Sequence, residues 1–323
     1  MNEPLRVAVI GASGIGQHHA RWYHLCGCDV VAFVGTSTES CERTRDRLAA
    51  YFGFSGRSYT DIEEMLKEEK PDIVDVSTPP QFHKEHSLAA LAAGAHVMCE
   101  KPFVWDVAKP LEEILEDGRE IVDSAGKAGR LLGVCSQYPG VIPIYRSFYE
   151  GTEGALQNVD SLTMEMEVKS RKEPKFREDI WIDVASHPLS LVVGFMPGGH
   201  IDLESARCAI EERENRAAFD YIHRDGKCRV EFVLRDIDEG DPIRRFGVNG
   251  FLVDWLGFPD EQGIFRAELR RGDQAVQGND FMHILIEEFV SAVNEGGGEV
   301  VVSGEDGLLN VKHQAELLDL ARQ

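Results

Sequence analysis

The chain has 323 residues, of which 43% are hydrophobic and 28% charged, as in globular proteins, and this length suffices for two domains. The formal net charge of -22 at pH 7 repels phosphate backbones and anionic lipids, so we expect neither nucleic acid nor a membrane as a partner. No apolar run approaches the roughly 20 residues of a membrane span. Residues 1–6 lead directly into an apolar strand without a signal-type stretch, so we expect a cytoplasmic protein.

The seven cysteines are an odd number without framework spacing, which predicts reduced thiols in a reducing compartment. Cys26 and Cys28 lie close in the sequence to His18, His19 and His24, which raises the hypothesis of a metal site. The C-x-C pair alone lacks the usual zinc spacing, and side chains on or just after a first helix that pack or face solvent also explain these residues. We therefore expect no metal.

Strands and helices are predicted to alternate over about the first 135 residues, as in a parallel, doubly wound sheet. Thr60-Asp61-Ile62-Glu63 matches a capping box, which predicts the start of a short helix. The predicted strands cover residues 5–10, 30–34, 73–76, 96–99 and 131–135, and the predicted helices cover 18–25, 82–93 and part of 107–128.

The pattern changes between about residues 156 and 270, where strand-like runs are separated by turn residues. This favours an open, mainly antiparallel sheet, and two helices are predicted to close the chain. We therefore expect an α/β protein with a dinucleotide-binding domain at 1–136 and a substrate-binding and oligomerisation domain at 137–302. The predicted strands are 162–168, 201–210, 229–234, 251–256 and 264–269, and the closing helices are 281–293 and 305–321.

A glycine-rich turn lies between the first predicted strand and the first helix, the context that a dinucleotide-binding turn requires. Gly11 permits the tight turn, and Gly16 permits close packing of the helix on the strand. Ser13 stands where a second glycine is usual, and Gly14 and Ile15 lead into the helix, whose free N–H groups point at a pyrophosphate. The alternative is a structural turn without a ligand.

The end of the second strand bears on the choice between NAD and NADP. NAD enzymes usually place an acid there to hold the ribose hydroxyls, but this chain has Gly35. Thr36 and Ser37 offer hydroxyls to a 2′-phosphate, and Arg43 follows on the next helix. Glu39 argues the other way. We favour NADP over NAD on this pattern.

The run from Asp72 to Pro102 closely resembles the Gfo/Idh/MocA family of glucose–fructose oxidoreductases and inositol dehydrogenases. The resemblance is strong over residues 5–102 and weaker beyond, where the run 303–307 also looks like the end of that family. It implies that the last helix, about 303–323, packs back on the first domain. The motifs that carry it are Ser77-Thr78-Pro79-Pro80, His83, Gly94, His96-Val97-Met98-Cys99 and Glu100-Lys101-Pro102.

By this resemblance, Thr78, Pro79 and His83 would line the cofactor. Glu100 would sit beside the nicotinamide ribose, and Lys101 would face both nicotinamide and substrate. The family also carries an Asp-x-x-x-His in its second domain, which Asp183 and His187 match here. The resemblance implies that these two residues and Lys101 form the catalytic group.

The chemistry of alcohol oxidation agrees with this set, because a proton must leave oxygen while a hydride leaves carbon. His187 is suited to take that proton, because the ordinary pKa of a histidine is about 6.5. Lys101 would polarise the oxygen or act as a base itself. Asp183 precedes His187 by one helical turn and would orient the imidazole. Pro188 fits a first helical turn, which predicts a helix beginning near Ser186. A solvated lysine and a core histidine are the alternatives.

Three departures from the family pattern fall where substrate is expected. Residues 177–182 replace a glycine-rich run, Ser190 replaces an aspartate, and residues 136–139 replace a stretch that usually contains Asn or Arg. Trp181 and Tyr138 in these segments are candidates for stacking on a sugar ring, and core packing is the alternative reading.

A basic cluster, formed by Arg171, Lys172, Lys175 and Arg177, stands out in an acidic chain. It would hold a carboxylate or phosphate of the substrate, or else form a solvated loop.

Taken together, the motifs predict an NAD(P)-dependent oxidoreductase. It would transfer a hydride between nicotinamide and a secondary alcohol or ketone of a sugar, cyclitol or related polyol. Two alternatives remain open, a redox-assisted elimination with tightly bound dinucleotide and a non-catalytic dinucleotide-sensing regulator. By resemblance we also expect a homo-oligomer, a dimer or tetramer, paired through the exposed face of the second domain's sheet.

Overall fold

The computed structural model describes residues 3–170 and 174–323, so Arg171 and Lys172 of the basic cluster lie outside the described residues. The chain forms two compact units. The first unit comprises Met1–Cys135 and Met282–Leu308, and the second comprises Ser136–Phe281 and Leu309–Gln323. Among the described residues, no helix has the length and apolar character that crossing a membrane requires.

The first unit is built on a six-stranded sheet in the order β3-β2-β1-β4-β5-β6, in which all pairings are parallel. This confirms the predicted Rossmann sheet. The strand order reverses between β1 and β4, and the carboxyl ends of the strands beside such a point are where ligands bind in open α/β sheets. The strands are β1 (Arg6–Ile10), β2 (Asp29–Val34), β3 (Arg57–Tyr59), β4 (Ile73–Val76), β5 (His96–Glu100) and β6 (Leu132–Cys135).

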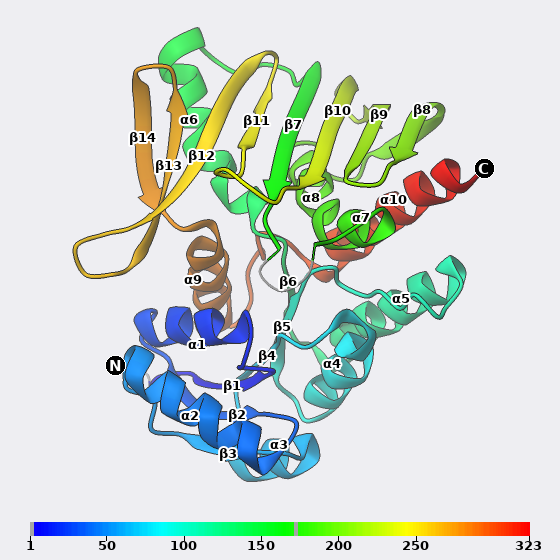
Figure 1. Cartoon of the computed structure of the whole chain (residues 1–323). Helices are drawn as coiled ribbons and strands as arrows, with labels where there is room; N and C mark the ends of the chain where they lie inside the picture. Colours follow the sequence, from blue (N-terminus) through cyan, green and yellow to red (C-terminus); the bar gives the residue numbers. More distant parts are fainter. Residues whose placement is uncertain (1–2, 171–173) are drawn as a thin grey trace. The chain divides into compact units, whose positions relative to one another are not determined.

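Helices cover this sheet, with α1 packing beside α2 and α4 beside α5 (Figure 1). The short helix α3 is capped by Asp61, whose carboxylate accepts a hydrogen bond from the backbone N–H of Glu64, and not by Thr60 as the capping-box pattern predicts. Helix α2 and strand β3 are absent from the predicted elements, because the first ten residues of α2 contain a single apolar residue, Cys41, and β3 has only three residues. The helices are α1 (Gly16–Leu25), α2 (Thr38–Phe52), α3 (Ile62–Glu69), α4 (His83–Ala92), α5 (Leu111–Ala128) and α9 (Phe281–Asn294).

The second unit contains an eight-stranded sheet in the order β14-β13-β12-β11-β7-β10-β9-β8. The pair β7 and β10 is parallel and the other pairs are antiparallel, which confirms the mainly antiparallel sheet. The strands are β7 (Ser161–Val168), β8 (His200–Ile210), β9 (Glu214–His223), β10 (Gly226–Asp236), β11 (Arg244–Val248), β12 (Phe251–Pro259), β13 (Phe265–Arg271) and β14 (Gln274–Asn279), and the helices are α6 (Ile142–Glu153), α7 (Glu178–Val184) and α8 (Ser186–Phe195).

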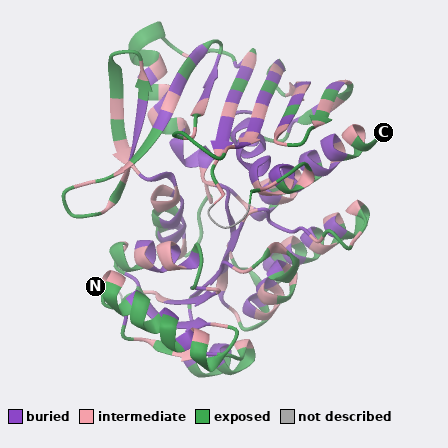
Figure 2. Ribbon diagram, viewed as in Figure 1, coloured by how far each residue is buried: buried purple, intermediate pink, exposed green. Residues whose placement is uncertain are grey.

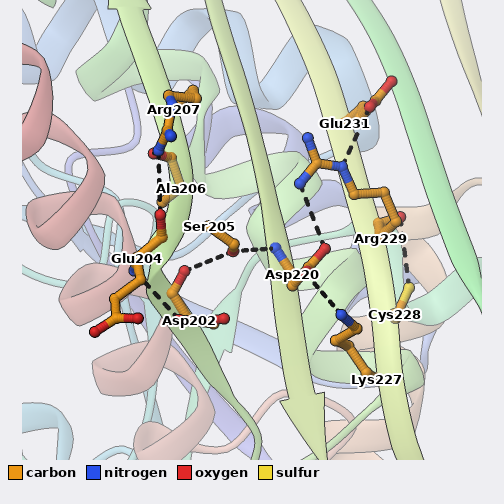
Figure 3. A network of polar contacts seen from close by, with 10 residues as sticks. All are labelled: Asp202, Glu204, Ser205, Ala206, Arg207, Asp220, Lys227, Cys228, Arg229 and Glu231. Atoms are coloured by element: carbon orange, nitrogen blue, oxygen red, sulfur yellow. Dashed lines mark hydrogen bonds and ion pairs between the residues drawn. The ribbon is translucent and has the colours of Figure 1, made fainter.

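One face of this sheet is packed and the other is open, as the alternation of buried and less buried residues along β9 and β10 shows (Figure 2). Charged side chains occupy the strands β8 to β10 (Figure 3). Asp220 on β9 accepts from Lys227 at 2.9 Å and from Arg229 at 3.4 Å. Ser205 ties a bulge in β8 to β9, because its hydroxyl accepts from the Asp220 N–H at 2.8 Å. Over β8 to β10 the open face therefore carries charged side chains of both signs.

The closing helices are divided between the units in a way that the sequence does not predict. Helix α9 belongs to the first unit, where the ring of Phe289 fills the space beside Gly133 on β6. Helix α10 (Gly304–Arg322) belongs to the second unit from Leu309 onward. There the Gln314 carbonyl accepts from the Trp181 indole at 3.0 Å.

Candidate functional site

The glycine turn between β1 and α1 has the backbone that its sequence predicts. Gly11 has a φ of +95°, and a Cβ there would lie 2.7 Å from the carbonyl oxygen of Ser77. A Cβ at Gly16 would lie 2.7 Å from the carbonyl oxygen of Gly11. Neither position accepts a side chain without backbone movement. Arg47 of α2 donates to the carbonyl oxygen of Ser13 at 3.0 Å and so braces the outer side of the turn.

A cavity of about 630 Å³ lies over this turn, at the carboxyl ends of β1, β2 and β4. Its volume falls within the range of roughly 300–1,000 Å³ that is usual for small-molecule sites. Gly11 and Gly14 of the turn are among its lining residues. These residues fit a dinucleotide. The lining consists of Ile10, Gly11, Ala12, Ser13, Gly14, Phe33, Val34, Gly35, Thr36, Ser40, Thr44, Thr60, Ile62, Ser77, Thr78, Pro79 and His86.

The predicted cofactor residues fall into two groups. Gly11, Ser13, Gly14, Thr36, Thr78 and Pro79 line the cavity. The other predicted residues are outside its lining, namely Ile15, Gly16, Ser37, His83, Glu100 and Lys101.

The end of β2 has little room for a side chain. Gly35 stands where NAD enzymes usually have an acid. A Cβ at Gly35 would lie 2.8 Å from the sulfur of Cys41, so a larger residue has no ready space there. Ser37 is the N-cap of α2, where its hydroxyl accepts from the Ser40 N–H at 3.2 Å. Arg43 is paired with Glu39 at 2.5 Å on the exposed side of that helix. The pocket edge therefore offers hydroxyl groups and no carboxylate among its lining residues.

Beyond β4, two histidines take different places. His83 is fully buried, and its Nε2 donates to the carbonyl oxygen of Thr78 at 2.7 Å while its Nδ1 lies 3.1 Å from the carbonyl oxygen of Pro102. Burial lowers the pKa of His83, and the ring lies between the loops that follow β4 and β5. His86, one helical turn later, lines the cavity and lies 3.0 Å from the Thr78 hydroxyl. Helical spacing from His83 is the signal that could have found His86.

The Glu100-Lys101-Pro102 motif lies where β5 ends. Glu100 is the last residue of the strand and is buried, and Lys101 is partly exposed. The backbone N–H of Lys101 donates to Oε2 of Glu100 at 2.9 Å. The peptide bond between Lys101 and Pro102 is cis. The motif therefore presents the lysine at the carboxyl edge of the parallel sheet.

In the second unit, Asp183 and His187 lie on almost continuous helix. Asp183 is in α7, His187 is in the first turn of α8, and Ala185 between the helices has helical dihedrals. The prediction that a helix begins at Ser186 is thus met, but the preceding residues are helical too. Lys175 forms an ion pair with Asp183, so this member of the basic cluster neutralises the predicted catalytic carboxylate.

The two aromatic candidates for substrate contact are core residues. Trp181 is fully buried and stacks on Phe232, with ring centroids 5.8 Å apart. Tyr138 is also fully buried, and its ring centroid lies 5.3 Å from that of His187. Burial raises the pKa of Tyr138, so its phenol stays protonated. The burial of both rings therefore favours core packing over stacking on a sugar. Tyr138 packs against the imidazole of His187.

Residues 5–136 match the family model described as "Oxidoreductase family, NAD-binding Rossmann fold". D-glucoside 3-dehydrogenase of Escherichia coli (strain K12) is 38% identical over 132 residues, which are 41% of this chain and 34% of that enzyme. Inositol 2-dehydrogenase of Klebsiella pneumoniae (strain 342) is 33% identical over 130 residues, 40% of this chain and 35% of its own length. The matches thus span about a third of the length of these curated relatives.

Among solved structures, levoglucosan dehydrogenase in complex with NADH and levoglucosan has a TM-score of 0.74 against this chain. The identity is 15%, with 99% of this chain and 98% of the other covered. GenD2 from gentamicin A biosynthesis, in complex with NAD, has a TM-score of 0.74 at 19% identity and covers 100% of this chain and 95% of its own. At these identities the likeness concerns the fold alone.

Proposed function

Because residues 5–136 make this chain a member of the Gfo/Idh/MocA family of oxidoreductases with an NAD-binding Rossmann fold, we propose that it is an NAD(P)-dependent dehydrogenase. Its substrate is a sugar, cyclitol or related polyol, oxidised at a secondary alcohol or reduced at the matching ketone. The observation that carries the proposal is the cavity over the Gly11–Gly16 turn, with Lys101 presented at the end of a neighbouring strand of the same sheet.

The bound dinucleotide supplies the acceptor or donor of the hydride. Side chains of the protein handle the proton, and we assign their roles by residue type and by their match to the family's motifs. The ammonium group of Lys101 polarises the substrate oxygen. His187 takes the proton that leaves this oxygen, and Asp183 orients the imidazole. The paired Lys175 restrains Asp183.

We propose NADP as the preferred cofactor. Support comes from the pocket edge, where Gly35 leaves no carboxylate to repel a 2′-phosphate and Thr36 and Ser40 bring hydroxyl groups. Titration of the stripped protein with NADP and NAD in turn measures the preference. Dinucleotide that survives exhaustive dialysis would instead favour redox-assisted elimination, in which no net cofactor turnover occurs.

A variant test addresses the oxidoreductase proposal directly. Lys101→Ala is expected to lower kcat for polyol oxidation about 10³-fold, within the range for loss of a proton-handling group, and to leave dinucleotide affinity within about threefold. Lys67→Ala removes an exposed lysine of α3 in the same unit and serves as the matched control. Equal turnover of the two variants on a substrate of the native chain would reject the proposal.

We also propose a homo-oligomer, a dimer or tetramer, that pairs through the open face of the second unit's sheet. The support is the alternation of both charge signs along β8 to β10, which lets a surface complement a second copy of itself (Figure 3). Sedimentation velocity at low and high salt tests it. A monomer at all concentrations and salt levels would contradict it.

A further inference from the structure

A buried polar network joins four elements of the first unit. His19 comes from α1, Asp75 from the middle of the apolar strand β4, Glu100 from the end of β5 and Cys135 from the end of β6. All four residues are buried, and His19 and Asp75 are fully so. None of them lines the cofactor cavity. Burying charged groups costs free energy of folding unless they are paired, so we asked what these residues do for the protein.

The imidazole of His19 lies between two carboxylates. Its Nδ1 is 2.9 Å from Oδ2 of Asp75, and its Nε2 is 3.3 Å from Oε1 of Glu100. Ionised carboxylates only accept hydrogen bonds, so both contacts are favourable when both ring nitrogens carry a proton. Burial alone lowers the pKa of His19, but the charge of Asp75 and its hydrogen bond to the ring raise that pKa well above its ordinary value.

The remaining neighbours agree with a positive ring. Ser77 donates to Oδ1 of Asp75 at 2.5 Å, so both oxygens of that carboxylate have a partner, Ser77 at one and His19 at the other. Tyr23, one turn after His19 on α1, is held as the neutral phenol because burial and the charge of Asp75 raise its pKa. The Cys135 sulfur lies 3.7 Å from Nε2, and burial raises its pKa to about 11, so it stays a thiol.

We propose that His19 is a positioning residue that fixes the Glu100 carboxylate, and through it the Lys101 backbone, by pairing as an imidazolium with Asp75 and Glu100. Glu100 is then held at both oxygens, by His19 at Oε1 and by the Lys101 N–H at Oε2. The same helix begins at the cofactor turn, so α1 connects that turn to the Glu100-Lys101-Pro102 loop. The kinetic part of this inference rests on the proposed dehydrogenase function.

A matched pair of variants separates the two contacts. His19→Gln places its amide near the position of Nε2 and keeps a donor to Glu100, whereas His19→Asn keeps the donor to Asp75. We expect kcat to fall about tenfold in His19→Gln and about 100-fold in His19→Asn, with dinucleotide Kd changed less than about threefold in both. His96→Gln, at the opposite end of β5, is the control for loss of a histidine from this sheet.

A role in folding alone gives a different result. The two variants would then lose kcat in proportion to their loss of Tm, and the order would not follow the contact to Glu100. Equal kcat in both variants and in the native chain would likewise overturn the proposal.

A spectroscopic measurement is independent of activity. In protein with ¹⁵N-labelled histidine, the His19 signals, identified by their absence in His19→Gln, are expected to show both ring nitrogens protonated between pH 6 and about pH 8. A neutral His19 ring at pH 7 would overturn the pairing. If the native chain oxidises no polyol, the dehydrogenase proposal fails while this spectrum still decides the state of His19.

Metal analysis tests the alternative that these residues bind a metal ion. Donor atoms of His19, Glu100 and Cys135 lie within 4.8 Å of one another, which is close enough to surround a small cation. The hydrogen-bonded network predicts purified native protein without stoichiometric metal. About one equivalent of zinc, lost in His19→Gln, would replace the imidazolium bridge by a metal site.

Discussion

The two units of this chain organise their functional side chains in different ways. In the first, parallel strands bring their carboxyl ends to one edge, so Gly11, Ser77 and Glu100 gather there although they are far apart in sequence. In the second, Asp183 and His187 are neighbours on helix, one turn apart. The first arrangement depends on sheet order and tight backbone turns, and the second depends on local helix geometry. Variants in the two units are therefore expected to fail differently.

An effect as large as that of Lys101→Ala is expected in the second unit. His187→Gln should lower kcat by about 10²–10⁴-fold, because the proton acceptor is lost, and Asp183→Asn should lower it about tenfold, because the ring loses its orienting charge. Dinucleotide affinity should not change, since the cavity belongs to the first unit. Steady-state kinetics and titration of each variant check this, with His223→Gln on β9 as the control. A weaker dinucleotide affinity with unchanged kcat would contradict the division of roles.

An intermediate effect is expected at the cofactor edge of the first unit. Gly35→Asp adds a carboxylate at the end of β2, which should weaken NADP binding by about tenfold, or 1.4 kcal/mol, relative to Gly35→Asn. The neutral asparagine variant carries the same Cβ, which would meet the Cys41 sulfur, and so controls for the local displacement. Calorimetry with both dinucleotides measures the difference. Equal affinities in the two variants would show that no 2′-phosphate lies at Gly35.

The smallest effect concerns the stability of the second unit. Arg322 of α10 pairs with Glu178 of α7 at 2.6 Å, and this hydrogen bond holds the pKa of Glu178 below its usual value. A depressed carboxyl pKa stabilises above the unfolded pKa, and the contribution is lost as pH falls through the folded value. The side chains of Arg322 and Glu178 are 49% and 40% exposed, so Arg322→Ala should cost less than about 1 kcal/mol at pH 7 and a smaller amount at pH 3. Thermal unfolding at both pH values tests this sign, and Arg224→Ala in a surface turn should have no effect.

The sequence predicts the first unit in more detail than the second for a physical reason. Glycines that must accept no Cβ, such as Gly11 and Gly16, leave an unambiguous local pattern. The NAD-binding Rossmann fold is confirmed on that basis. Side chains whose role depends on burial leave no such pattern. Trp181 and Tyr138 are residue types that often stack on sugar rings, but here both lie in the core.

Two further differences come from competition between nearby residues. Thr60 and Asp61 are both good helix caps, and the structure uses Asp61, which frees Thr60 to line the cavity. His83 and His86 are one turn apart, and burial of His83 leaves His86 at the cavity. Asp75, a charge inside a buried strand, is a further sequence signal of the network around His19. Its partners come from other elements and only the fold brings them together.

Calorimetric titration of purified, cofactor-stripped protein with NADP and with NAD tests the central claim most directly. The cavity over the Gly11–Gly16 turn predicts one micromolar site per chain, with NADP bound more tightly than NAD. Absence of heat and of binding with both dinucleotides would contradict the account, because the turn would then be a structural feature without a ligand.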